Sequence, residues 1–218
     1  HCLNQKEVAR RYCEEKGLNY NKCNFVVCHL GGGVSITAHR EGQMIDSNDN
    51  LIGDGPMTPL RAGTIPATKL LDLAFSGDYT HEELEDIIVR NSGLSSHLGT
   101  SDVKEIMRRI EEENDEYARL VLDAMIYQFS KAVGECACVL KGQVDAILIT
   151  GGLARSEYIV RSLKQYVDWI AETWVMPGEW EIAALASGAY QAMTGQVPVL
   201  TYTGVPVFRG FRSLKYHL

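Results

Sequence analysis

The chain has 218 residues, 45% of them apolar, which is enough material for one sizeable core or for one lobe of a larger protein. Its 21 basic and 28 acidic residues give a formal charge of −7, which argues against duplex DNA or an anionic membrane as the main partner. The apolar runs, such as residues 146–149, are too short to cross a bilayer, whereas a nucleotide needs only a local positive field.

The six cysteines have neither a Cys-x-x-Cys spacing nor the density of a disulfide scaffold. We therefore expect reduced thiols, several of them buried, and a cytoplasmic location. The sequence begins at His1 without a signal-peptide pattern, so we expect either a processed N-terminus or a fragment.

The first part of the chain predicts one helix followed by three strands. The helix covers residues 1–17 and ends at Gly17, a residue typical of helix C-termini. Strands are predicted over residues 24–29, 34–39 and 43–46, and their tight connections indicate an antiparallel meander. Residues 47–67 are rich in Asn, Asp, Gly and Pro and predict a long loop, which is usually functional or disordered.

Helices dominate the rest of the chain. They are predicted over residues 68–75, 80–90, 101–113 and 115–140, and Thr80 and Glu83 have the spacing of a capping box. A strand over 144–149 precedes a helix over 156–166, and a strand over 172–175 precedes a helix over 179–193. Residues 205–208 could form a short edge strand. This order predicts an α/β fold, a mixed five-stranded sheet (β-β-β-α-β-α-β-α) flanked by helices.

Two glycine clusters, each directly after an apolar strand, are candidate phosphate sites: residues 29–33 and residues 150–154. Glycines let the backbone approach a ligand closely, and their amides can cradle phosphate oxygens, helped by the N-terminus of a following helix. Neither cluster matches the P-loop or the Gly-x-Gly-x-x-Gly pattern. Two plain tight turns are the alternative interpretation.

Arg61 and His29 are the charged or titratable candidates near these clusters. The Arg61 guanidinium could clamp an acyl or phosphoryl oxygen bidentately, or it could simply be solvated. His29 could donate to a phosphate, or it could be a satisfied core histidine. A serine hydrolase is not supported, because the chain has no Gly-x-Ser-x-Gly elbow.

The order of strands and glycine turns resembles the ribonuclease-H-like lobe shared by sugar kinases, actin, heat-shock ATPases, and acetate and butyrate kinases. Within that superfamily the chain resembles the butyrate kinases of the acetokinase family. The motifs that carry this resemblance are His29-Leu-Gly-Gly-Gly33, Gly55-Pro-Met-Thr-Pro-Leu-Arg-Ala-Gly63, Leu98-Gly-Thr-Ser-Asp102 and Asp145-Ala-Ile-Leu-Ile-Thr-Gly-Gly152.

The resemblance implies that residues 1–195 form a C-terminal nucleotide-binding lobe and that residues 196–218 form a tail, which could pack on an N-terminal lobe encoded upstream. It implies the reversible reaction of butyrate with ATP to give butyryl phosphate and ADP, with Mg²⁺, in a homo-oligomer without nucleic-acid or membrane partners. Because the family's first phosphate loop, catalytic aspartate and acyl-binding arginine precede this region, the chain alone is expected to be inactive. A non-catalytic nucleotide-binding or interaction domain, or a related kinase with another carboxylate substrate, is the alternative.

The resemblance also implies roles for individual residues. Arg61 would stabilise the phosphoryl group in transfer, and Gln5 stands where acetate kinases have an assisting histidine. Gly32 stands where acetate kinases have an asparagine, so one side-chain contact is absent. Either Glu179 or Glu181 would hold the metal through water. The implied nucleotide contacts are His29, Leu30, Gly31, Gly32 and Gly33 for the β- and γ-phosphates, Asp102, Val103 and Lys104, and Gly152, Leu153, Ala154, Arg155 and Ser156 for adenosine.

Overall fold

The computed structural model describes residues 1–205. The chain divides into two compact units, His1–Ala184 and Leu185–Leu218, and the first holds the whole sheet. Of the edge strand predicted over residues 205–208, residue 205 is irregular and the remainder lies outside the described residues.

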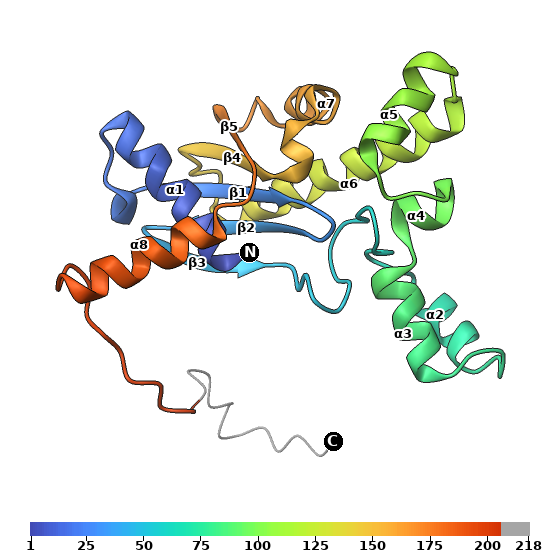
Figure 1. Ribbon diagram of the computed structural model, residues 1–218, viewed down its shortest axis with the longest axis horizontal. Coiled ribbons are helices and arrows are strands. Elements are labelled where there is room, and N and C mark those ends of the chain that lie inside the picture. The colour runs from blue at the N-terminus through green and yellow to red at the C-terminus, as the bar shows by residue number, and fades with distance from the viewer. Residues whose placement is uncertain (206–218) are drawn as a thin grey trace. The chain divides into compact units, whose positions relative to one another are not determined.

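One mixed five-stranded sheet forms the centre of the first unit (Figure 1). Its strands are β1 (Asn24–Leu30), β2 (Val34–Arg40), β3 (Gln43–Ser47), β4 (Ala146–Gly151) and β5 (Thr173–Pro177), in the order β3-β2-β1-β4-β5. β2 pairs antiparallel with β1 and β3, whereas β4 pairs parallel with β1 and β5. The predicted mixed sheet and its antiparallel meander are therefore confirmed.

Helices fill most of the remaining chain, and most of them match the predicted ranges. They are α1 (Cys2–Lys16), α2 (Ala67–Ala74), α3 (His81–Arg90), α4 (Gly93–Leu98), α5 (Val103–Glu112), α6 (Glu116–Val139), α7 (Glu157–Val167) and α8 (Glu181–Met193), with 3₁₀ turns η1 (Tyr20–Lys22) and η2 (Gly152–Arg155). Gly17 ends α1 in the left-handed conformation, and Thr80 and Glu83 form the predicted capping box. Helix α4 was not predicted, because six residues are too few to show a helical period.

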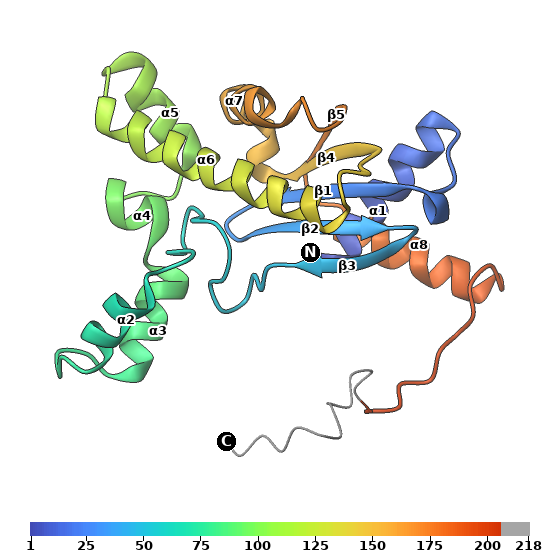
Figure 2. The same cartoon turned by 180° about the vertical axis from the view of Figure 1, so that it is seen from behind.

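The central strand β1 is buried because helices cover both faces of the sheet. Helix α6 crosses one face, in front in Figure 2, and α1 lies on the opposite face, in front in Figure 1. Side chains alternate along a strand, so Val26 and Cys28 join the core beneath α6, whereas Phe25 and Val27 join the core beneath α1. This packing fixes the strand ends that carry the glycine clusters.

The six cysteines are unpaired, and four of them are buried, as predicted. Burial raises the pKa of the Cys13 and Cys136 thiols to about 12, so both stay protonated and act as core side chains. Within residues 1–205 no helix is long and apolar enough to cross a membrane.

Candidate functional site

The two glycine clusters lie at the C-terminal ends of the neighbouring parallel strands β1 and β4, where His29 pairs in register with Thr150. Gly151 brings the two backbones together: a Cβ there would lie 2.8 Å from the Leu30 nitrogen and 2.7 Å from the Leu30 carbonyl carbon. The Gly151 amide and carbonyl also exchange hydrogen bonds with Gly178, both at 3.0 Å, at the end of β5. Ligands of open α/β sheets bind at such carboxyl ends of parallel strands.

Arg61 lies directly against the first glycine cluster. The Thr58 hydroxyl donates to the Gly32 carbonyl oxygen at 2.8 Å and accepts from the Arg61 amide at 2.9 Å, so it ties the long loop to the turn. A Cβ on Gly33 would overlap the Arg61 Nη1 atom and would lie 3.0 Å from its Cζ atom. The fold therefore unites two candidates that the sequence indicated separately.

Helix α4 holds the backbone of this loop from the other side. The amide of Ser92, which precedes α4, donates to the Leu60 carbonyl at 2.9 Å, and the Leu94 amide inside the helix donates to the Thr58 carbonyl at 3.2 Å. Gly93 has a φ of +62°, and a Cβ there would lie 2.8 Å from the Arg61 carbonyl oxygen. The unpredicted helix thus positions Arg61, and the sequence signal for it is the glycine at residue 93.

The Arg61 guanidinium keeps its charge free of carboxylates. Its Nη1 donates to the Asn50 side-chain oxygen at 2.7 Å, and its buried Nε has no hydrogen-bond partner among the described residues. Arg61 makes none of the ion pairs found within residues 1–205. A free guanidinium beside glycine amides is suited to anionic oxygens such as those of phosphate.

His29 is buried and neutral at physiological pH. It is 3% exposed, and its pKa is lowered to about 4, mainly by burial, while Glu181 opposes the shift. Its ring centroid lies 4.2 Å from that of His1, with the two rings tilted by 51°, and its Nδ1 has no partner in the described part of the chain. His29 is therefore a core histidine, but not a fully satisfied one.

Gln5 sits in a buried chain of hydrogen bonds rather than beside Arg61. Its Nε2 donates to the Ser35 hydroxyl at 2.7 Å, and its Oε1 lies 3.2 Å from His39 Nε2. Burial lowers the pKa of His39 to about 4, so its neutral ring donates from Nε2 and accepts at Nδ1 from the Tyr20 hydroxyl at 3.3 Å. The Ser35 hydroxyl then donates to His1 Nδ1 at 2.7 Å. The four hydrogen bonds therefore run in one direction, each group donating to the next from Tyr20 to His1.

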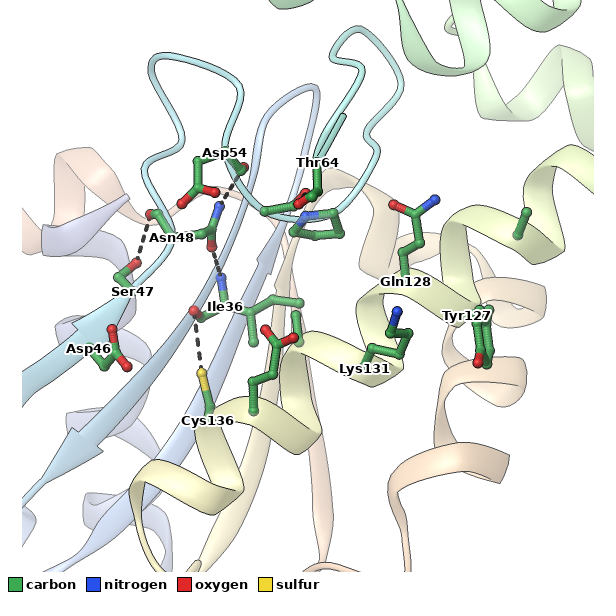
Figure 3. Close-up of a pocket in the computed structure, with 15 residues that line it drawn as sticks. Ile36, Asp46, Ser47, Asn48, Asp54, Thr64, Tyr127, Gln128, Lys131 and Cys136 are labelled. Atoms are coloured by element: carbon green, nitrogen blue, oxygen red, sulfur yellow. Dashed lines mark hydrogen bonds between the residues drawn. The ribbon is translucent and has the colours of Figure 1, made fainter. Parts of the chain in front are cut away.

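A cavity of about 380 Å³ is lined both by members of this hydrogen-bond network, Gln5 and Ser35, and by Asn50, the residue that holds Arg61. A larger cavity, about 660 Å³, opens between α6, the ends of β2 and β3, and the long loop (Figure 3). None of the predicted site residues lines the larger cavity.

The remaining nucleotide-contacting candidates fall into two groups. Gly152–Arg155 form the turn η2, and Ser156 caps α7 by accepting from the Ile159 amide at 3.4 Å, beside the end of β4. Asp102 caps α5 by accepting from the Lys104 amide at 2.9 Å. Within residues 1–205, no hydrogen bond or ion pair joins residues 102–104 to either glycine cluster.

Glu179 and Glu181 follow β5, and they have the donor chemistry of a Mg²⁺ site. Mg²⁺ usually keeps several waters and takes one or two carboxylates besides phosphate oxygens. Glu181 is close enough to His29 to raise its pKa, so one carboxylate lies near the end of β1. The described residues contain no group of three or more side chains that could hold a metal without such help.

The sequence is similar to that of known proteins over most of its length. The model of the acetokinase family matches residues 1–168. A probable butyrate kinase of Bacteroides thetaiotaomicron is 49% identical over 202 residues, which are 93% of this chain and 57% of that protein. One of Listeria innocua is 44% identical over 195 residues, covering 89% of this chain and 55% of that protein. The chain thus spans little more than half the length of these curated relatives.

Solved structures show the same fold. Acetate kinase of Porphyromonas gingivalis superposes with a TM-score of 0.78 at 23% identity, covering 86% of this chain and 54% of that one. A propionate kinase of Francisella tularensis gives a TM-score of 0.74 at 20% identity, covering 84% and 52%. The expected ribonuclease-H-like sheet is therefore confirmed.

Proposed function

The chain belongs to the acetokinase family, and we propose that the protein containing it transfers the γ-phosphoryl group of ATP to a short-chain carboxylate. Butyrate is the proposed acceptor, because the curated relatives are named probable butyrate kinases. A carboxylate oxygen attacks the γ-phosphorus, the bond to the bridging oxygen breaks, and butyryl phosphate and ADP leave. The reverse reaction makes ATP.

The observation that carries this proposal is the position of Arg61 over the glycine turn of residues 31–33. Phosphoryl transfer needs positioning and charge stabilisation more than covalent chemistry. The turn amides would hold the β- and γ-phosphates, and the fork of Arg61 would meet the oxygens of the group in transfer. His29 and Leu30 hold this turn at the end of β1.

The other contacts of the nucleotide are proposed from the family match. Adenosine would lie near residues 152–156, and residues 102–104 would contact it from another side. Gln5 would act near the group in transfer, held by Ser35 and His39. Mg²⁺, held through water by Glu179 or Glu181, would supply charge neutralisation of the phosphates when bound.

The proposal also covers the domain organisation of the protein and its cellular location. Residues 1–195 would form the nucleotide-binding lobe of a homo-oligomeric protein, and residues 196–218 would form a tail that packs on an N-terminal lobe. The unpaired cysteines support a cytoplasmic location, where thiols stay reduced.

The test replaces Arg61 by lysine in the protein containing this chain. Lysine keeps the charge but loses the planar fork, so we expect kcat with ATP, Mg²⁺ and butyrate to fall at least about 100-fold, while KM for ATP changes by less than about threefold. Arg90→Lys is the matched control, because Arg90 pairs with Asp86 on the exposed surface of α3.

Two outcomes would contradict the proposal. A wild-type protein that binds ATP but phosphorylates none of butyrate, acetate and propionate would be a non-catalytic nucleotide-binding protein. A change in Arg61→Lys that falls mainly on KM for ATP would make Arg61 a binding residue.

A further inference from the structure

We propose that Asn50 is the positioning residue of Arg61: its neutral side-chain oxygen holds the guanidinium across Gly33 without neutralising its charge. The inference rests on the proposed function of Arg61 and adds a residue that the sequence did not single out. It follows from the way the long loop is anchored, from the contact itself and from the charges around it.

The loop is anchored where it leaves the sheet. Asn48 accepts from the Ile36 amide at 2.9 Å and donates to the Val34 carbonyl at 2.9 Å, so its side chain continues the pairing of β2 (Figure 3 shows the bond to Ile36). Two residues later the chain has little freedom, because the Asp49 amide donates to the Asp54 carboxylate at 3.2 Å and the Asp54 amide returns a bond to the Asp49 carbonyl at 3.2 Å. Asn50 is thus held at a defined place beside Gly33.

The contact with Arg61 is equally defined. Asn50 Oδ1 accepts from Arg61 Nη1 at 2.7 Å, and both atoms occupy the space where a Cβ of Gly33 would stand. The other end of Arg61 is fixed as well, since its amide donates to the Thr58 hydroxyl. A long side chain tied at the backbone and at the tip loses little freedom when a ligand binds.

The Arg61 guanidinium bonds to the neutral side chain of Asn50, although carboxylates lie nearby. Two carboxylates lie near Asn50 in the long loop, but both have other partners: Asp49 accepts from the Leu51 amide at 2.8 Å, and Asp54 accepts from the Asp49 amide. Neither pairs with Arg61. An amide oxygen orients the guanidinium and leaves its full charge and its unpartnered Nε for an anionic ligand.

The alternative is that Asn50 only stabilises the loop. The two roles predict opposite orders for two variants, one that keeps the size of asparagine and one that removes its side-chain amide. Asn50→Asp keeps the shape and strengthens the hold on Arg61 but cancels its charge, whereas Asn50→Ala releases the guanidinium with its charge intact. A positioning role gives the kcat order wild type, Ala, Asp. A role confined to the loop, in which residue 50 does not contact Arg61 during turnover, gives wild type equal to Asp, with Ala lowest.

The experiment measures kcat and KM of both variants in the protein containing this chain. We expect kcat to fall about threefold to tenfold in Asn50→Ala and at least about 30-fold in Asn50→Asp, with KM for ATP changed by less than about threefold in both. Leu51→Asp is the matched control, because it adds one negative charge at a 75% exposed neighbouring position. It should keep the wild-type kcat. An Asn50→Asp variant at least as active as Asn50→Ala would overturn the inference.

A second measurement separates this inference from the proposed function. The Arg61 Nε–H signal, assigned in nitrogen–proton NMR spectra by its loss in Arg61→Lys, is titrated with inorganic phosphate. We expect a saturable shift in the wild type and at least tenfold weaker phosphate affinity in Asn50→Asp. If no carboxylate is phosphorylated but the phosphate result holds, the proposed function fails and the inference stands. Equal phosphate affinities in the two proteins would refute the inference itself.

Discussion

Gly151 joins the two glycine clusters, and replacing it by alanine should be among the most destabilising single changes in the chain. The residue has φ +92° and ψ 177°, a region that is essentially restricted to glycine and costs roughly 1–3 kcal/mol for other residues. The added Cβ would also lie 2.7–2.8 Å from backbone atoms of Leu30, which cannot move without opening the pairing of β1 with β4. We therefore expect a loss of about 4–5 kcal/mol, close to the whole stability of many domains.

Two other glycines calibrate this value. Gly17 has φ +66° but open space at its Cβ position, so Gly17→Ala measures the cost of the left-handed backbone alone, about 1 kcal/mol. Gly152 has neither a positive φ nor an atom within 4 Å of its Cβ position, so Gly152→Ala should change stability by less than about 0.5–1 kcal/mol.

The assay is urea unfolding of the protein containing this chain, followed by circular dichroism, with the free energy taken by linear extrapolation. The order of loss should be Gly151→Ala, then Gly17→Ala, then Gly152→Ala. If Gly151→Ala lost no more than Gly17→Ala, the close approach of the two strand ends would not be needed, and the argument for a shared phosphate site at those ends would fail.

Two further predictions concern Gly33 and the buried histidines. Gly33→Ala should lower kcat at least about tenfold, because the added Cβ displaces the Arg61 guanidinium. In Gly32→Ala the added Cβ meets only Leu60, at 3.7 Å, so this variant should change KM for ATP instead. Steady-state kinetics separates the two effects, and equal kcat values in the two variants would contradict the placement of Arg61. His39 has a folded pKa of about 4 against 6.5 unfolded, so the unfolded chain binds more protons between these values, and stability is lost as pH falls from 6.5 towards 4. The free energy of unfolding should drop by about 2 kcal/mol from this residue between pH 7 and pH 5, and His39→Gln should remove that part of the drop. An unchanged pH dependence in His39→Gln would show that folding does not shift the pKa of His39.

The sheet and its glycine turns could be predicted because their signals are local. The apolar run from residue 24 and the run from residue 144 are each bounded by turn residues, and both became central strands. The glycine clusters that directly follow these two runs could be recognised as candidate phosphate sites, because that signal is local as well. Residue 93 shows the limit: its glycine begins a helix only because the amides that follow meet carbonyls of the Arg61 loop.

The side-chain partners in the site could not be predicted, because they depend on how distant segments pack. Gln5 meets His39 only when α1 lies on the sheet, and nothing in either segment specifies the pairing. Asn50 was one polar residue among many in a loop without periodicity. Its meeting with Arg61 depends on the space left by Gly33. The catalytic, nucleotide-binding and metal-binding roles of all the candidate residues stay predictions.

The parallel pairing of β1 with β4 has a consequence for how the protein is made. The Asn24 amide meets the Asp145 carboxylate across 121 residues of chain, and all of α2 to α6 is synthesised in between. At about 5–20 residues per second, a ribosome needs roughly 6–24 s to reach β4 after finishing β1. The β1–β2–β3 meander forms quickly from near neighbours, but during that interval one edge of its most apolar strand has no partner and is exposed to other nascent chains. Slow synthesis of the helical segment therefore favours aggregation, and a chaperone that covers the edge of β1 would raise the yield of folded protein.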